Sequence, residues 1–212
     1  MFLIRPPYRI PGWVEKMFPY LNFRVPVQNN SVFLTFDDGP TEGVTEYVLE
    51  QLDKYNFKAT FFLIGDKIRP HADIVQMIKA EGHRLGNHTF HHVDAWKTPL
   101  KEYLAEIRET QEILDCIQPD IDPLFRPPYG HITPAYARKI TEHGFRIIMW
   151  KHLSLDYMSG LNIHDSLKNL QKVKPGDIIV FHDSEKAFPQ LKQMLPSFLD
   201  FLKSKALFSD IL

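Results

Sequence analysis

The chain has 212 residues, a length typical of a single domain built around one hydrophobic core. Hydrophobic residues make up 44% and charged residues 24% of the chain, a balance that excludes global disorder. The formal net charge of -1 provides no electrostatic attraction to nucleic acid or to an anionic membrane.

Cys116 is the only cysteine, which excludes an intrachain disulfide and a thiolate metal cluster. Its position in an amphipathic stretch predicts a small buried side chain.

The N-terminus predicts neither a signal peptide nor a membrane anchor. Only three apolar residues lie between Met1 and Arg5, fewer than the roughly 7 to 15 of a secretory signal. No window approaches the roughly 18 apolar residues of a spanning helix. We therefore expect a soluble, cytoplasmic protein, with a removed signal or an association with the cell envelope as the alternative.

Strand-like and helix-like segments alternate from residue 31 to the end of the chain. The predicted strands are residues 31–36, 58–65, 83–89, 123–127, 145–151 and 176–183. The predicted helices are residues 44–55, 71–82, 100–117, 133–144, 163–173 and 189–204, with Thr98 and Thr133 as expected N-caps. A seventh strand is expected either in residues 158–163 or near the N-terminus. This alternation predicts an α/β architecture with parallel strands, in fewer units than an eight-stranded barrel needs.

Polar residues follow the predicted strands at the points where those strands end. Asp37 and Asp38 follow the first strand, His88 lies near the end of the third with His92 beyond it, and Arg126 lies near the end of the fourth with Tyr129 beyond it. Asp156 follows the fifth strand, and His182 lies near the end of the sixth. In βα barrels, the loops at the carboxyl ends of the strands build the site. Side chains from five segments are therefore expected to converge on one rim.

Each motif also has a structural interpretation. Asp-Asp-Gly-Pro is a good turn sequence, because Asx side chains satisfy nearby backbone amides. A histidine pair four residues apart is most often a solvated helix face, Arg-Pro-Pro-Tyr-Gly can be a rigid loop, and His182 can be a core histidine. Chance alone would have to explain five coincidences, so we favour a functional site.

Two imidazoles and one carboxylate form a three-ligand set that leaves an open position on zinc or a similar divalent ion. His88 and His92 have the spacing of the His-Glu-x-x-His metalloprotease pair, but no glutamate follows the first histidine. A catalytic base must then come from elsewhere. One carboxylate of the Asp37-Asp38 pair can bind the metal while the other takes a proton from water whose pKa the metal lowers to roughly 7.

The motifs TFDDGP, HTFHH, RPPYG and FHD, in this order, closely resemble the polysaccharide deacetylase family, carbohydrate esterase family four. The resemblance implies a single-domain distorted (β/α)7 barrel, similar to a TIM barrel, that removes acetyl groups from sugar polymers with a metal ion. It makes Asp37 the catalytic base, and Asp38, His88 and His92 the metal ligands. His91, between the two ligands, matches no functional position.

The same resemblance assigns the remaining catalytic positions. His182 would be the general acid, and Asp156 would orient it and keep it protonated. Arg126 would pair with Asp37 and hold it charged and oriented. The backbone N–H of Tyr129 would help to stabilise the oxyanion.

The resemblance places the substrate around Pro128, Tyr129, Trp150, Tyr157 and Val180. Two of these depart from the family pattern, which usually has Trp at position 157 and Leu at position 180. Those residues line the pocket for the acetyl methyl group, so Tyr157 and Val180 are expected to change its shape and polarity. Trp96, just beyond the histidine pair, is either a sugar-stacking face or a packing residue.

The prediction is a metal-dependent hydrolase that removes N-acetyl groups from a glycan, with zinc as the first choice of ion and cobalt, nickel or manganese as alternatives. An O-acetyl esterase of the xylan type and a catalytically silent carbohydrate-binding protein are the competing hypotheses. Residues 31–212 are expected to form the catalytic domain and residues 1–30 an arm packed on the barrel. The expected partner is an acetylated glycan, not nucleic acid, and the expected state is a monomer or weak oligomer.

Overall fold

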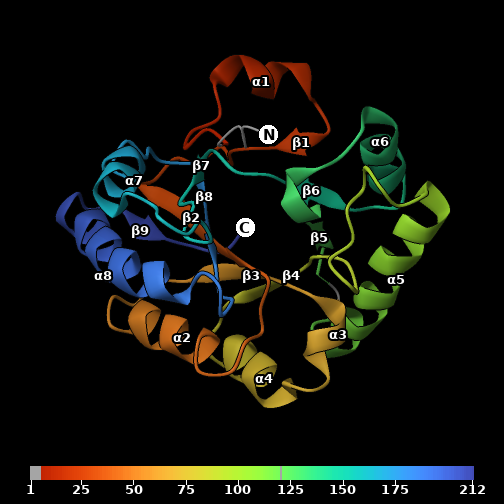
Figure 1. Ribbon diagram of the computed structural model, residues 1–212, viewed down its shortest axis with the longest axis horizontal. Helices are drawn as coiled ribbons and strands as arrows, with labels where there is room; N and C mark the ends of the chain where they lie inside the picture. The colour runs from red at the N-terminus through yellow and green to blue at the C-terminus, as the bar shows by residue number, and fades with distance from the viewer. Residues whose placement is uncertain (1–5, 120) are drawn as a thin grey trace.

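The computed structural model describes residues 6–119 and 121–212. Its centre is a curled parallel sheet with the strand order β1-β6-β5-β4-β3-β2-β8-β7, and β9 pairs with β2. Helices cover the outside of this sheet as a ring (Figure 1). The strands are β1 Leu21–Asn22, β2 Ser31–Asp37, β3 Ala59–Leu63, β4 Arg84–Asn87, β5 Leu124–Phe125, β6 Arg146–Ile148, β7 His152–Leu153, β8 Ile178–His182 and β9 Phe208–Ser209.

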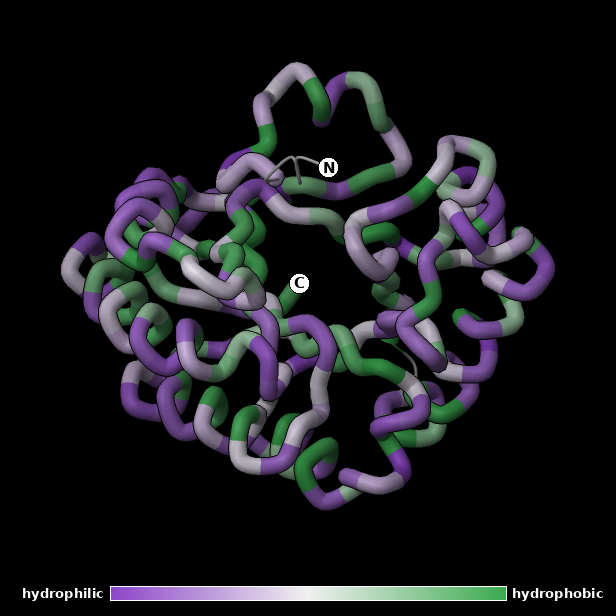
Figure 2. Tube along the Cα trace, in the orientation of Figure 1, coloured by the Kyte–Doolittle hydropathy of each residue, from purple (hydrophilic) through white to green (hydrophobic). Residues whose placement is uncertain are grey.

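The central strand β2 is buried along its whole length, as expected for a parallel strand with both faces covered. Its neighbours β3 and β8 pair with it in parallel, so that Asp37 lies opposite Phe62 on one side and His182 on the other. Hydrophobic segments gather inside the ring, and hydrophilic ones dominate its outer face (Figure 2). The register therefore brings the polar ends of β2 and β8 to the same edge of a hydrophobic sheet.

The six predicted helices are all present. The helices are α1 Gly12–Met17, α2 Thr45–Asp53, α3 Gly65–Ile68, α4 Ala72–Ala80, α5 Leu100–Ile117, α6 Pro134–Glu142, α7 Ile163–Leu170 and α8 Phe188–Ser204. Helix α8 shows why the pattern works, because Leu191, Met194, Leu195, Phe198 and Leu202 repeat at helical spacing and are fully buried. The expected distorted (β/α) barrel is confirmed.

Some local predictions were wrong. The seventh strand, expected in residues 158–163 or near the N-terminus, is found near the N-terminus as β1, whereas the short β7 and β9 were not predicted. Cys116 is exposed because it lies two positions beyond the buried Leu114, on the opposite side of α5. Thr98 is not the N-cap, because α5 begins at Leu100 and Pro99 occupies the cap position. Thr133 does cap α6, accepting from the Tyr136 N–H.

The N-terminal segment bridges the two ends of the sheet. Residue Arg9 pairs with His152 in an antiparallel bridge, while β1 pairs with β6 at the other end. Between them, α1 lies at the top of the ring (Figure 1). The Glu15–Lys151 ion pair attaches it to the residue before β7. Residues 1–5 of the expected arm lie outside the described residues, and its boundary at residue 30 stays a prediction.

The last residue of the chain closes the bottom of the sheet. Leu212 packs with Phe33, Phe62 and Ile178 in a small hydrophobic cluster, and its N–H donates to the Thr60 hydroxyl. The candidate site lies at the opposite end of the sheet, where the strands end. Within the described ranges, none of the helices has the length and apolar character needed to cross a membrane.

Candidate active site

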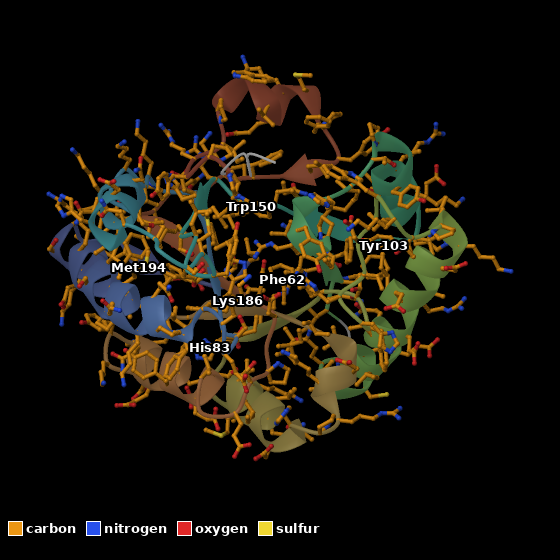
Figure 3. All side chains as sticks on the ribbon, in the orientation of Figure 1. Phe62, His83, Tyr103, Trp150, Lys186 and Met194 are labelled. Atoms are coloured by element: carbon orange, nitrogen blue, oxygen red, sulfur yellow. The ribbon has the colours of Figure 1, made fainter. Side chains whose placement is uncertain are left out.

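A cavity of about 560 Å³ opens at the carboxyl ends of the strands. Its wall includes the predicted site residues Asp37, Asp38, His88, His92, Tyr129, Trp150, Tyr157, Val180 and His182. Trp150 and Lys186, which both line it, project toward the middle of the ring (Figure 3). Predicted site residues as far apart in the sequence as Asp37 and His182 therefore share one cavity, as the strand-end argument expected.

The first of the two adjacent carboxylates, Asp37, is paired with a buried arginine. Arg126 Nη1 donates to Asp37 Oδ1 over 2.6 Å, and the arginine side chain is fully buried. A charged hydrogen bond of this length in a region that excludes water is strong, because little solvent competes for either group. The pair fixes the position of the Asp37 carboxylate at the end of β2.

Arg126 is itself held by backbone and hydroxyl groups. Its Nε donates to the carbonyl of Ile148, its Nη2 to that of Met149, and Nη1 also to the Thr35 hydroxyl. The guanidinium carbon lies 4.1 Å from the centre of the Phe62 ring, which is labelled in Figure 3. A buried arginine is stable only when its donors are satisfied, and here β2, the last residue of β6 and the residue after it supply the acceptors.

The second carboxylate, Asp38, faces two imidazoles. Its Oδ1 lies 3.2 Å from His92 Nε2 and 3.6 Å from His88 Nε2. One ligand atom from each of the three residues falls within 4.8 Å of the others. Nitrogen and carboxylate ligands at such separations are suited to a divalent ion with an open coordination position.

Hydrogen bonds on the far side of each imidazole orient both rings. His88 Nδ1 donates to the Arg126 carbonyl over 2.8 Å, and His92 Nδ1 lies 3.2 Å from the Tyr129 hydroxyl. Both Nε2 atoms are left for a ligand. Burial lowers the pKa of His88 to about 4, which favours the neutral ring that a metal requires.

The charge around Asp38 favours its ionised form. Burial opposes ionisation, but the hydrogen bond from His92 and the charges of His182, His88 and His92 outweigh it and hold the Asp38 pKa well below its ordinary value. A carboxylate in this state is a ready ligand for a cation. Asp38 is therefore ionised, as a carboxylate ligand of a metal has to be.

On the other side of the cavity, His182 pairs with Asp156. The ring Nδ1 lies 2.7 Å from Asp156 Oδ1, and the His182 backbone N–H donates to Asp156 Oδ2 over 2.9 Å. Burial disfavours the imidazolium, but the attraction of Asp156, Asp38 and Asp37 prevails and raises the pKa of His182 to about 9. His182 is therefore protonated at neutral pH.

Unusual backbone conformations cluster at this cavity. Positive φ values occur at Asp38 (79°), His92 (57°) and Tyr129 (61°), all of which line it. Thr89 (64°) and Leu155 (61°) adjoin His88 and Asp156. Non-glycine residues rarely adopt this region, and such strain gathers at functional sites because packing there overrides the local preference.

Three predicted site residues do not line the cavity. Arg126 and Asp156 are fully buried behind Asp37 and His182, and Pro128 is buried while its neighbour Pro127 lines the wall. His91 points elsewhere and pairs with Glu106 at 2.9 Å. The sequence reasoning missed several lining residues: Pro6, Pro127, Gly130, His131, Leu153 and Lys186.

For four of the missed residues the sequence did contain a signal, since Pro127 and Gly130 belong to the RPPYG motif itself. His131 directly follows the RPPYG motif, and Lys186 lies four positions beyond His182. Gly130 is required by contact, because it has φ +67° and a Cβ there would lie 2.4 Å from the Trp150 ring. Pro6 has no motif, and only the path of the N-terminal segment brings it to the wall.

The match to a family model decides the assignment. The model described as polysaccharide deacetylase matches residues 24–148, which is more than half of the chain. The chain belongs to the polysaccharide deacetylase family. It is a hydrolase of that family, and the resemblance seen in the motifs is confirmed.

Known relatives of this chain are also named as deacetylases. A peptidoglycan-N-acetylglucosamine deacetylase of Bacillus cereus is 36% identical over 194 residues, covering 85% of this chain and 70% of that protein. A chitooligosaccharide deacetylase of Rhizobium leguminosarum bv. trifolii is 31% identical over 157 residues, covering 73% and 72%. A solved peptidoglycan N-acetylglucosamine deacetylase superposes with a TM-score of 0.79 at 33% identity, covering 94% of this chain and 93% of its own.

Proposed function

We propose that this deacetylase removes the N-acetyl group from N-acetylglucosamine units of a glycan of the peptidoglycan or chitin type, with the help of a divalent metal ion. The observation that carries the proposal is that two adjacent carboxylates have different partners. Asp37 is bound to Arg126, whereas Asp38 faces His88 and His92. One carboxylate is therefore placed to take a proton and the other to hold a cation.

The three proposed ligands fit a divalent ion. Asp38 Oδ1 and the two Nε2 atoms converge, and the far nitrogen of each ring already has a partner. Such an ion, when bound, acts as a Lewis acid on the acetyl carbonyl and lowers the pKa of water. Mixed nitrogen and oxygen ligands favour zinc, although cobalt, nickel and manganese suit the same set.

The chain supplies both proton-transfer groups. Asp37 accepts a proton from the attacking water while the oxygen of that water bonds to the acetyl carbon. Arg126 keeps the Asp37 carboxylate in place. His182, charged because of Asp156, then donates a proton to the amide nitrogen of the sugar as the bond between the acetyl carbon and that nitrogen breaks. Acetate and a free amine are the products.

Binding groups surround this proton path. The backbone N–H of Tyr129 is proposed to donate to the oxyanion, supported by the left-handed conformation that the residue adopts in the cavity wall. An apolar cluster that includes Leu153, Val180, Trp150 and Tyr157 lies at the same wall. It would accept the acetyl methyl group, with Pro128 positioning the Tyr129 loop.

The proposal is tested by measuring acetate release and metal content on one purified sample. N-acetylglucosamine oligomers, peptidoglycan fragments and acetylated xylan are assayed before and after chelation, together with Asp37→Asn. We expect release from an N-acetylated substrate that is lost on chelation and in the variant. Release from xylan alone would identify an O-acetyl esterase, and bound metal without any release would favour a silent binding protein.

The part of the chain that carries this activity is proposed to be residues 31–212, with residues 1–30 as a supporting arm. The contact of Pro6 with the cavity and the Glu15–Lys151 ion pair support an arm that stabilises the site from one side. Removing residues 1–17 tests this role. We expect a lower melting temperature and a raised KM, while an unchanged enzyme would contradict it.

A further inference from the structure

Beyond the histidine pair, Trp96 and His131 form a face-to-face stack. Their ring centres are 3.6 Å apart and their planes differ by 7°. His131 lines the cavity, whereas 62% of Trp96 is exposed to solvent. The two residues precede α5 and α6, which stand side by side in the ring (Figure 1). The stack therefore extends the cavity wall outward into solvent.

Further rings connect this stack to the proposed metal ligands. The Tyr129 ring lies 5.7 Å from His131 and 4.6 Å from His92, measured between ring centres, and Tyr129 is 60% exposed. His92, Tyr129, His131 and Trp96 thus form a continuous line of rings, the aromatic row, which leads from the proposed metal site to the surface. A polymer with one unit in the cavity would extend along such a row.

A carboxylate fixes the stack in place. Asp94 Oδ1 accepts from the Trp96 backbone N–H over 2.9 Å and from His131 Nδ1 over 3.0 Å. The Asp94 carbonyl accepts from the N–H groups of Lys97 and Thr98, which closes the turn around it. An exposed tryptophan held in one orientation before its ligand arrives does not have to be ordered on binding, so more of the contact energy appears as affinity.

Trp13 shows that this arrangement is not a general property of exposed tryptophans here. Trp13 is 63% exposed, nearly the same as Trp96, but it makes no ring contact with another described residue and does not line the site cavity. Large exposed aromatic groups beside a binding cavity commonly mark an interaction surface. Of these two exposed tryptophans, Trp96 is therefore the one that neighbouring side chains hold in place beside the cavity.

We propose that the Trp96–His131 stack is a subsite for a second sugar ring of the glycan, adjacent to the ring whose acetyl group is removed. The inference rests on the proposed function. The C–H face of a pyranose carries slight positive charge and packs on the negative face of an indole, while its hydroxyl groups stay in water. The exposed face of Trp96 offers that contact, and the aromatic row links it to the reacting centre.

The test compares Trp96→Ala and Trp13→Ala on N-acetylglucosamine oligomers from the disaccharide to the pentasaccharide. We expect Trp96→Ala to lower kcat/KM on the pentasaccharide roughly tenfold, the change produced by losing one aromatic contact, with a smaller fall on the disaccharide. The loss should appear mainly as a raised KM, because the contact exists in both ground and transition states. Trp13→Ala should match the wild type at every length.

Trp96→Phe keeps an aromatic face and should recover part of the lost affinity, which separates stacking from a folding defect. Equal losses at every oligomer length, or no loss at all, would overturn the subsite. A second arm measures pentasaccharide binding to the wild type, Trp96→Ala and Trp13→Ala by calorimetry, without turnover. Weakened binding only in Trp96→Ala supports the subsite even if no acetate is released, whereas equal affinities or no binding to the wild type would refute it.

Discussion

Arg126 donates a 2.6 Å hydrogen bond to Asp37 across 89 positions of the chain, and both side chains are buried. The pair joins the end of β2 to the loop after β5, directly beside the cavity. It therefore has two roles that can be separated by experiment, one in orienting the proposed base and one in balancing a charge inside the protein.

Asp37→Asn removes the charge while preserving the shape of the side chain. We expect kcat to fall by about 10²- to 10⁴-fold, the usual contribution of a general base. The uncompensated guanidinium should also lower the free energy of unfolding by roughly 3 kcal/mol, because breaking a buried ion pair leaves the other charge without a partner. Acetate release and urea unfolding measure the two effects.

Asp73→Asn, at an exposed position in the first turn of α4, is the matched control and should change neither quantity appreciably. Metal content should stay equal in all three proteins, since Asp38 is the proposed ligand. Full activity in Asp37→Asn would exclude Asp37 as the base.

The His182–Asp156 pair predicts the alkaline limit of activity. With a pKa of about 9, His182 remains protonated at neutral pH, and kcat/KM should fall as the pH rises past that value. Asp156→Asn removes the principal attraction and should move this limit to lower pH by about one unit or more. A pH–rate profile that does not shift would contradict the role of Asp156.

The same pair affects stability in a defined pH window. The folded-state pKa of His182 is raised above the ordinary value of 6.5, so the imidazolium favours the folded protein. Its contribution is complete below pH 6.5 and is lost as the pH rises from there through about 9. Urea unfolding of the metal-free wild type and Asp156→Asn across this range measures it, and NMR titration of the His182 ring gives the pKa directly.

The hydroxyl of Tyr129 offers a test of the metal site that leaves the proposed ligands intact. Tyr129→Phe removes the hydroxyl 3.2 Å from His92 Nδ1 but keeps the backbone N–H. We expect zinc affinity to fall by roughly tenfold, since groups that orient a ligand usually contribute that much. Zinc calorimetry measures it, with Tyr20→Phe as an exposed control. Unchanged affinity would remove Tyr129 from the set that orients the ligands.

His182→Gln distinguishes acid catalysis from simple binding. An amine leaving group needs a proton from the enzyme, whereas the alkoxide released from an ester needs less help. We expect a larger fall in kcat on an N-acetylated oligosaccharide than on acetylated xylan or an aryl acetate, by at least about tenfold. Equal falls on both substrates would count against His182 as the general acid.

Tyr157 and Val180 occupy the positions where the family pattern has Trp and Leu, and both line the cavity. The Tyr157 ring lies 4.8 Å from that of His182, so its size affects both the acetyl pocket and the acid. Tyr157→Trp combined with Val180→Leu should shift the ratio of kcat/KM between N-acetyl and O-acetyl substrates. Side-by-side assays measure the ratio, and an identical ratio would exclude both positions from substrate selection.

Local sequence patterns predicted the repeating units well, because their information lies in neighbouring residues. Hydrophobic spacing located six helices and six strands, and Thr133 with Pro134 located the start of α6. The same patterns failed for β7 and β9, which are two residues long and exist only through their partners. Short strands leave no periodicity to detect.

The sequence by itself also determined which residues are available for the chemistry. The adjacent Asp37 and Asp38 and the four-residue spacing of His88 and His92 are local, and their place after strands follows from the alternation of elements. The spacing of residues alone could not establish how distant segments meet: the pairs of Arg126 with Asp37 and of His182 with Asp156 were expected only from the family resemblance, and the stack of His131 on Trp96 was not expected at all. Strand register and helix packing set those distances, and no local pattern encodes them, because each depends on parts of the chain that touch only after folding.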